Sequence, residues 1–197
     1  MNYAGIGSRE TPDWVICVME KMGAWLAKKG DNLRSGGADG ADSAFERGCD
    51  SAYGKKEIFL PWQGFQGRGE KKDGNRNVYC HYNNVDDAIK IAKKYHPYWE
   101  NLSNGGRALM ARNSYQVLGK DLVTPSDFVV CYTEGGKEKG GTAQAMRIAK
   151  DKGVPIFNIG NYKEQEVQKV VDDFNKFYLE IKKSKENQKE EEILEER

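Results

Sequence analysis

Short apolar runs alternate with amphipathic runs along the first 160 residues, and glycine stands at most of the joints between them. Alternation of this kind favours a parallel sheet, because parallel strands need crossover connections of a dozen or more residues. We therefore expect an α/β fold with three αβα layers and a mainly parallel sheet. The expected strands cover 2–8, 32–34, 56–62, 127–133 and 154–160.

The first helix should run from Thr11 to Gly30. Thr11 suits an N-cap, Pro12 suits a position whose missing N–H costs nothing, and Gly30 suits a helix end. An apolar stripe lies along one side of this segment and comprises Trp14, Val18, Met22, Trp25 and Leu26. Further helical patterns cover about 40–49, 85–95, 105–119 and 142–153.

Two segments depart from the alternation. Residues 63–104 are rich in glycine, charge and aromatic side chains, so we expect an insertion or lid within a domain at 1–160. Residues 161–197 predict a C-terminal helix with a charged tail, whose last fifteen or so residues should be frayed or solvated. The apolar side of 164–178 is available to a second copy of the chain, which would give a homo-oligomer.

The charge balance and the hydropathy of the sequence indicate which classes of binding partner are disfavoured. The 31 basic and 30 acidic residues nearly cancel, so no global positive field favours unspecific binding of nucleic acid. No apolar run approaches the roughly 20 residues that span a bilayer, and the N-terminus lacks a signal-peptide pattern. We expect a cytoplasmic protein, bacterial or in a phage-infected host, with no membrane partner.

The cysteines are widely spaced and form no C-x-x-C pair. We therefore expect no zinc site and no disulfide framework, and assign no metal. Cys17 and Cys131 should be buried as small apolar side chains. The four cysteines and the two available histidines are Cys17, Cys49, Cys80, Cys131, His81 and His96.

Three glycine-bearing turns each join the C-terminal end of an expected strand to a helix. They read GIGSRETP at 5–12, SGGADGAD at 35–42 and EGGKEKGGTAQA at 134–145. In a doubly wound sheet these turns meet at one edge, where helix N-termini present unpaired N–H groups and glycine admits a phosphate. Ser8, Ser35 and Thr142 add hydroxyl donors. This grouping predicts a site for an anion or a nucleotide.

Neither standard nucleotide fingerprint is complete. The first turn has Gly5 and Gly7 of G-x-G-x-x-G, but Glu10 replaces the third glycine. The third turn has the spacing of a P-loop, but Gly141 takes the lysine position before Thr142. A dinucleotide cofactor and a triphosphate clamp are both disfavoured, and no cofactor is predicted.

Charged residues near the second turn refine the ligand. Asp39, Asp42 and Glu46 share one side of the opening helical turns, where they would either accept hydrogen bonds from ribose hydroxyls or only stabilise the helix N-terminus. Arginine binds oxyanions with a planar fork of donors. The candidate phosphate partners are Arg9, Arg107 and Arg112.

Four motifs, GIGSR, SGGADGAD, ARNSYQVL and GGTAQAMRIA, resemble the SLOG superfamily of Rossmann-like domains. That group includes DNA-processing protein A (DprA), the LOG phosphoribohydrolases and a YspA/YpsA-related (YAcAr) branch, often phage-encoded, to which this chain is most similar. The resemblance covers most of residues 1–160 and implies a nucleotide or ADP-ribose-like ligand. With the residue patterns above, the predicted ligand site is Gly5, Gly7, Ser8, Arg9, Ser35, Gly36, Gly37, Asp39, Asp42, Arg112, Gly140, Gly141, Thr142 and Gln144.

One departure from the family bears on catalysis. LOG enzymes carry P-G-G-x-G-T-x-x-E, whose glutamate serves hydrolysis, whereas Thr142 is followed here by Ala143, Gln144 and Ala145. A protein that binds the nucleotide, as a sensor or by sequestering it, is therefore the leading hypothesis. In the first alternative, an N-glycosidic hydrolase, another acid would replace the missing glutamate, and the candidates are Asp39, Asp42, Glu46 and Glu134.

The second alternative is a DprA-like accessory protein that binds single-stranded DNA. Such a protein needs a basic groove with aromatic side chains on which bases stack. The basic run GRGEKKDGNRN at 67–77 would supply the charge. The aromatics would be Trp62, Phe65, Tyr79 and Tyr82, although packing inside the inserted segment explains them as well.

Overall fold

A computed structural model of the chain describes residues 1–73 and 76–195. Its strands are β1 (Asn2–Gly7), β2 (Asn32–Ser35), β3 (Lys55–Phe59), β4 (Lys71–Asp73), β5 (Arg76–Tyr79), β6 (Phe128–Tyr132) and β7 (Ile156–Asn158). Its α-helices are α1 (Asp13–Lys28), α2 (Ala41–Ser51), α3 (Val85–Tyr95), α4 (Asn104–Leu118), α5 (Gly140–Asp151) and α6 (Val167–Glu195). Short 3-10 turns cover Phe65–Gly67, Trp99–Asn101, Glu134–Gly136, Ile159–Asn161 and Glu164–Glu166.

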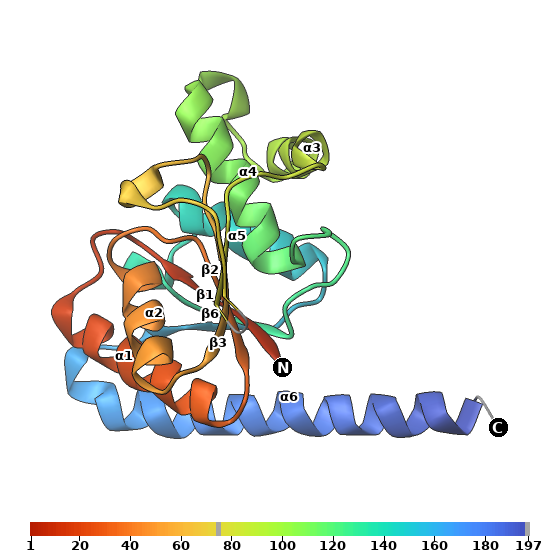
Figure 1. The fold of residues 1–197 in the computed structure, drawn as a ribbon. Helices are drawn as coiled ribbons and strands as arrows, with labels where there is room; N and C mark the ends of the chain where they lie inside the picture. The colour runs from red at the N-terminus through yellow and green to blue at the C-terminus, as the bar shows by residue number, and fades with distance from the viewer. Residues whose placement is uncertain (74–75, 196–197) are drawn as a thin grey trace. The chain divides into compact units, whose positions relative to one another are not determined.

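The strands of the described residues form one sheet in the order β4-β5-β3-β2-β1-β6-β7. All neighbours pair in parallel except β4, which runs antiparallel to β5. Helices α1 and α2 cover one face of the sheet, and α4 and α5 cover the other (Figure 1). The predicted Rossmann-like three-layer αβα fold with a mainly parallel sheet is confirmed.

The helices pack closely on both faces of the sheet, with glycine at two tight contacts on one face and apolar side chains on the other. On the α1–α2 side, a Cβ at Gly5 would lie 2.7 Å from the Phe45 ring, and one at Gly48 would lie 2.1 Å from the Glu20 carbonyl oxygen. These two positions therefore need glycine. On the α4–α5 side, β1 and β6 contribute buried apolar side chains that pack against those of the helices, including Ala4, Ile6, Val129 and Cys131.

Two local expectations in the first helix are wrong. Pro12, rather than Thr11, stands at the N-cap of α1, because the Thr11 hydroxyl donates to the Ser8 carbonyl at 2.6 Å instead of capping the helix. Cys17 is exposed. It lies off the buried stripe of α1, which includes Val18, Met22 and Leu26, whereas Cys131 is buried as expected.

The aromatic-rich segment 63–104 supplies more of the sheet than its composition indicates. It contains β4, β5 and α3, and β5 extends the parallel sheet by pairing with β3. The sequence did not predict these two strands, because their side chains lack an apolar alternation.

The chain divides into two compact units, Met1–Asn161 and Tyr162–Arg197. In the second unit, the Tyr162 hydroxyl donates to Asp173 at 3.0 Å. Helix α6 continues to Glu195, and most of the described side chains near its end are exposed, which agrees with the solvated rather than the frayed alternative. Residues 196–197 of the predicted tail lie outside the described residues. None of the helices within 1–73 and 76–195 has the length and apolarity to cross a bilayer.

Candidate functional site

A cavity of about 800 Å³ opens at the C-terminal ends of β1 and β6. These strands are neighbours in the sheet, and their following connections lead in opposite directions, to β2 and to β7. Such a switch point is where open α/β sheets form a crevice for ligands. The turns after β1 and β6 line this cavity, together with part of the turn after β2 and one side of α4.

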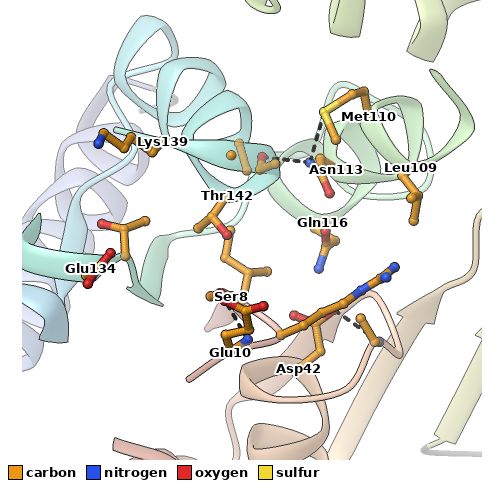
Figure 2. A pocket seen from close by; sticks show the side chains of 18 of the residues that line it. Ser8, Glu10, Asp42, Leu109, Met110, Asn113, Gln116, Glu134, Lys139 and Thr142 are labelled. Atoms are coloured by element: carbon orange, nitrogen blue, oxygen red, sulfur yellow. Dashed lines mark hydrogen bonds between the residues drawn. The ribbon is translucent and has the colours of Figure 1, made fainter. Parts of the chain in front are cut away.

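The structure brings eight of the predicted site residues to the cavity wall. These residues are Gly7, Ser8, Arg9, Asp42, Arg112, Gly140, Gly141 and Thr142. Figure 2 shows Ser8 and Asp42 on one side of the space and Thr142 on the other. Six predicted residues are not among the lining residues, and these are Gly5, Ser35, Gly36, Gly37, Asp39 and Gln144.

Several of those six have a structural role behind the wall. The buried Ser35 hydroxyl donates to the Gly5 carbonyl at 2.8 Å, which ties β2 to β1. Gly37 has a φ of +68°, a backbone conformation that glycine adopts readily. Asp39 is exposed and accepts a hydrogen bond from Gln66 at 2.9 Å. These residues shape or flank the turns rather than face the cavity.

An ion pair between Asp42 and Arg112 forms part of the wall. Arg112 Nη1 lies 3.0 Å from Asp42 Oδ2, which also accepts from the N–H groups of Gly36 and Ala38 at 3.2 and 3.3 Å. Burial raises the pKa of the Asp42 carboxyl, while the Arg112 guanidinium and the Ala38 N–H act in the opposite direction. A Cβ at Gly36 would lie 1.4 Å from Arg112 Nη1, so glycine at this position makes room for the guanidinium.

Helix α4 presents Arg112, which the sequence predicted, and two polar side chains that the site prediction missed, Asn113 and Gln116. Asn113 Nδ2 donates to the Gly141 carbonyl and to Gln144 Oε1, both at 3.0 Å, and so joins α4 to α5. Arg112, Asn113 and Gln116 are each less than a tenth exposed, and all three line the cavity. Gln116 lies four residues after Arg112 and three after Asn113, and this helical spacing was the available signal.

Three buried donors in or near this wall have no acceptor among the described residues. Arg112 Nε and Gln116 Nε2 belong to residues that line the cavity, whereas Gln144 Nε2 belongs to a residue that does not. A buried donor without a partner costs about 1–3 kcal/mol. Figure 2 shows the amide nitrogen of Gln116 directed into the space between Asn113 and Asp42. Two residues of the cavity wall, Arg112 and Gln116, therefore carry donors for which the described residues supply no acceptor.

The N-terminus of α5 adds further donors to the opposite part of the wall. Lys139 is its N-cap, and no side chain caps this end. Gly140 and Gly141 leave the backbone open to a ligand, and the helix dipole favours negative charge here. Besides the Asp42–Arg112 pair, the charged residues that line the cavity are three cations and two carboxylates: Arg9, Lys137, Lys139, Glu10 and Glu134.

The acids proposed for catalysis lie in different surroundings. Glu46 is buried and accepts two hydrogen bonds from Arg68 at 2.9 and 2.8 Å, and Lys56 lies 3.4 Å away, so its carboxylate is fully engaged away from the cavity. Glu134 lines the cavity, and so does Glu10, which the prediction did not include.

The aromatic side chains considered for DNA stacking are largely used in packing. Phe65 and Tyr79 are buried, and the ring of the partly buried Tyr82 stacks on Tyr115 at 4.2 Å. Trp62 remains exposed. Residues 74 and 75 of the basic run lie outside the described residues. No aromatic stacking surface is evident among the four side chains.

Arg107 does not reach the cavity. Its guanidinium lies 5.8 Å from the centre of the Trp99 ring, and Nη2 lies 3.5 Å from Glu100 Oε2. Of the three arginines considered as phosphate partners, the cavity wall therefore contains Arg9 and Arg112.

No protein-family model matches this chain, and no curated protein matches it. Among solved structures, DNA processing protein A from Helicobacter pylori, described as binding single-stranded DNA, has a TM-score of 0.51 at 19% identity. The match covers 80% of this chain and 64% of that one. At this level of identity, the similarity shows a shared fold and nothing more.

Two further structures are similar at lower scores. TM1055, a structural genomics target, has a TM-score of 0.49 at 21% identity, and the match covers 79% of this chain and 71% of that one. The Moco carrier protein from Chlamydomonas reinhardtii has a TM-score of 0.46 at 14% identity, with coverage of 81% and 75%.

Proposed function

We propose that the cavity binds a small nucleotide or nucleotide-derived ligand, such as ADP-ribose or a nucleoside phosphate, and that the protein acts as a sensor or sequesters this ligand. The observation that carries the proposal is the set of buried donors without acceptors, of which Arg112 and Gln116 line the cavity. Phosphate and carbonyl oxygens are acceptors without hydrogens, so they match such a wall.

The positions of the charged groups suggest how the ligand would lie. The phosphate would lie against the uncapped N-terminus of α5, near Thr142 and Lys139. The rest of the ligand would extend along α4 toward Gln116. A volume of about 800 Å³ lies within the range of pockets that enclose a small organic ligand.

Membership of the SLOG superfamily, in its YspA/YpsA-related branch, is part of the same proposal. It is supported by the GIGSR and SGGADGAD motifs, which occupy the turns after β1 and β2. The fold shared with DNA processing protein A is consistent with it. Binding of single-stranded DNA is not favoured, because the aromatics considered for stacking are mostly packed inside.

Calorimetry against AMP, ADP, ADP-ribose, NAD and a cyclic nucleotide tests the proposal. We expect at least one to bind with a dissociation constant below the millimolar range and Thr142→Val to weaken it. Ser114→Ala is the matched control, because that buried hydroxyl donates to Ala88 away from the cavity. If the folded protein binds none of the panel, the proposal fails.

A second candidate, an N-glycosidic nucleotide hydrolase, is favoured by one observation: the carboxylates of Glu10 and Glu134 both line the cavity. A carboxylate is the group that such hydrolysis requires as a general base or to stabilise positive charge on the sugar. Incubation with nucleoside monophosphates and NAD, followed by chromatography for free base, separates the two functions. Release of free base by the wild-type protein, and its loss in Glu134→Gln, supports hydrolysis. If the substrates stay intact, the protein binds the nucleotide without hydrolysing it.

A further inference from the structure

Three side chains of different chemistry converge at the outer edge of the sheet, away from the nucleotide cavity. Glu70 directly precedes β4, and Cys80 and His81 directly follow β5. Because β4 and β5 are antiparallel, with Lys71 opposite Val78, the start of β4 lies beside the end of β5. The fold therefore brings together residues that lie ten and eleven positions apart.

The donor atoms of this cluster have the spacing of a coordination shell. Cys80 Sγ lies 3.4 Å from His81 Nδ1, and the same nitrogen lies 3.3 Å from Glu70 Oε2. One sulfur, one nitrogen and one carboxylate oxygen are all within 4.8 Å of one another. Tetrahedral zinc has Zn–S of about 2.3 Å, Zn–N of about 2.0–2.1 Å and Zn–O of about 2.0–2.2 Å, which places S and N about 3.6 Å apart, and N and O about 3.4 Å apart.

We infer that Glu70, Cys80 and His81 form a binding site for Zn²⁺, with a water molecule as the fourth ligand. The thiol loses its proton to solvent when the metal binds, and sulfur, imidazole nitrogen and carboxylate oxygen are all zinc ligands. This differs from the sequence expectation of no metal, because sequence spacing placed only two of the three ligands together. The inference does not rest on the proposed nucleotide function.

The cluster is open to solvent on the side of two ligands and buried at the third, so an ion can enter and still be bound by the protein. Cys80 is buried, whereas the side chains of His81 and Glu70 are 69% and 37% exposed, which leaves a path for the ion. The Cys80 thiol of the metal-free protein donates a hydrogen bond to Gln63 Oε1 at 2.7 Å, and this bond is released when the thiol loses its proton. His81 Nδ1 faces both the Cys80 sulfur and the Glu70 carboxylate, but a ring nitrogen carries at most one hydrogen to donate. A cation bound between the three atoms accepts a lone pair from each of them.

Metal at this position would join the two open ends of the β4–β5 hairpin. Strand β4 is the edge strand of the sheet and has only three residues. A ligand that binds only the folded state stabilises it by mass action, so zinc is expected to raise the melting temperature.

Titration of the full-length protein with Co²⁺, in the presence of a phosphine reductant, tests the site. We expect a thiolate-to-cobalt charge-transfer band in the near ultraviolet that Zn²⁺ removes by displacement and Mg²⁺ does not. Cys80→Ser should abolish the band, and Cys17→Ser, which removes an exposed cysteine, should retain it. Absence of the band from the wild-type protein, or its persistence in Cys80→Ser, would overturn the inference.

Two further variants test the other ligands. His81→Ala should weaken Co²⁺ binding by more than the roughly 10- to 100-fold that loss of an outer-shell partner costs, and His96→Ala should leave it unchanged. The Zn²⁺-dependent rise in melting temperature should be present in the wild-type protein and absent from Cys80→Ser. Unchanged cobalt affinity in His81→Ala, or equal zinc stabilisation of Cys80→Ser, contradicts a three-ligand site.

Discussion

Replacement of Gln116 by methionine is expected to stabilise the ligand-free protein and to weaken its nucleotide complex. Gln116 is 1% exposed, and its Nε2 has no hydrogen-bond partner among the described residues. Removing a buried donor without a partner recovers about 1–3 kcal/mol. Methionine is unbranched like glutamine and fills a similar volume, so little packing is lost.

The magnitude of each effect can be stated in advance. For a protein of this length, each kcal/mol raises the melting temperature by roughly 2–4 °C. A hydrogen bond from the Gln116 amide to a neutral acceptor oxygen of the ligand contributes about 0.5–1.5 kcal/mol, so its loss weakens binding by roughly 2- to 13-fold. Urea denaturation and calorimetry with the ligand that binds most tightly measure the two quantities independently.

A control on the same helix separates these effects from general damage. Ser114→Ala removes a buried hydroxyl that donates to the Ala88 carbonyl at 3.3 Å. It is expected to lower the free energy of unfolding by about 0.5–1.5 kcal/mol and to leave the dissociation constant unchanged. If Gln116→Met is destabilised while its ligand affinity equals that of the wild type, the Gln116 amide is not a free donor in the cavity and the reasoning is refuted.

Three other outcomes follow from contacts in and around the cavity. Gly36→Ala places a methyl group against the buried Arg112 guanidinium, so calorimetry should record weaker binding and denaturation a loss of about 1–3 kcal/mol. Glu46→Gln breaks the ion pair with Arg68 and should lower the free energy of unfolding by about 3 kcal/mol. This is the low end for a buried pair, because Arg68 is partly exposed. Nucleotide affinity should be unchanged. Hydrogen bonds within its turn lower the pKa of Asp121, so their stabilisation is present above pH about 4 and is lost on further acidification. Asp121→Ala should lack that loss in acid denaturation curves.

The meeting of the glycine-bearing turns at one edge of the sheet was predictable because its signals are local. Each of the turns after β1, β2 and β6 carries glycine between an apolar run and a helix, and parallel strands bring such turns to one edge. Gly7 and Gly141 accordingly line one cavity. Gly37 does not line it, but Asp42, at the end of the same motif, does.

Other features depend on contacts that sequence spacing does not encode. Glu46 was considered as a catalytic acid, but Arg68, 22 positions away, holds its carboxylate. Asn113 and Gln116 of α4, unlike Arg112, became site candidates only when the helix was placed beside the turns. Strand β4 is short and polar, so its pairing with β5 rather than its composition defines it. The exposure of Cys17, by contrast, follows from helical periodicity and was predictable.

A crystal structure with the most tightly bound nucleotide tests the central claim most directly. The account predicts the ligand in the cavity at the C-terminal ends of β1 and β6, with an acceptor oxygen about 3 Å from Gln116 Nε2 and a phosphate at the N-terminus of α5 near Thr142. Density for the nucleotide elsewhere on the molecule, with this cavity unoccupied, would contradict it.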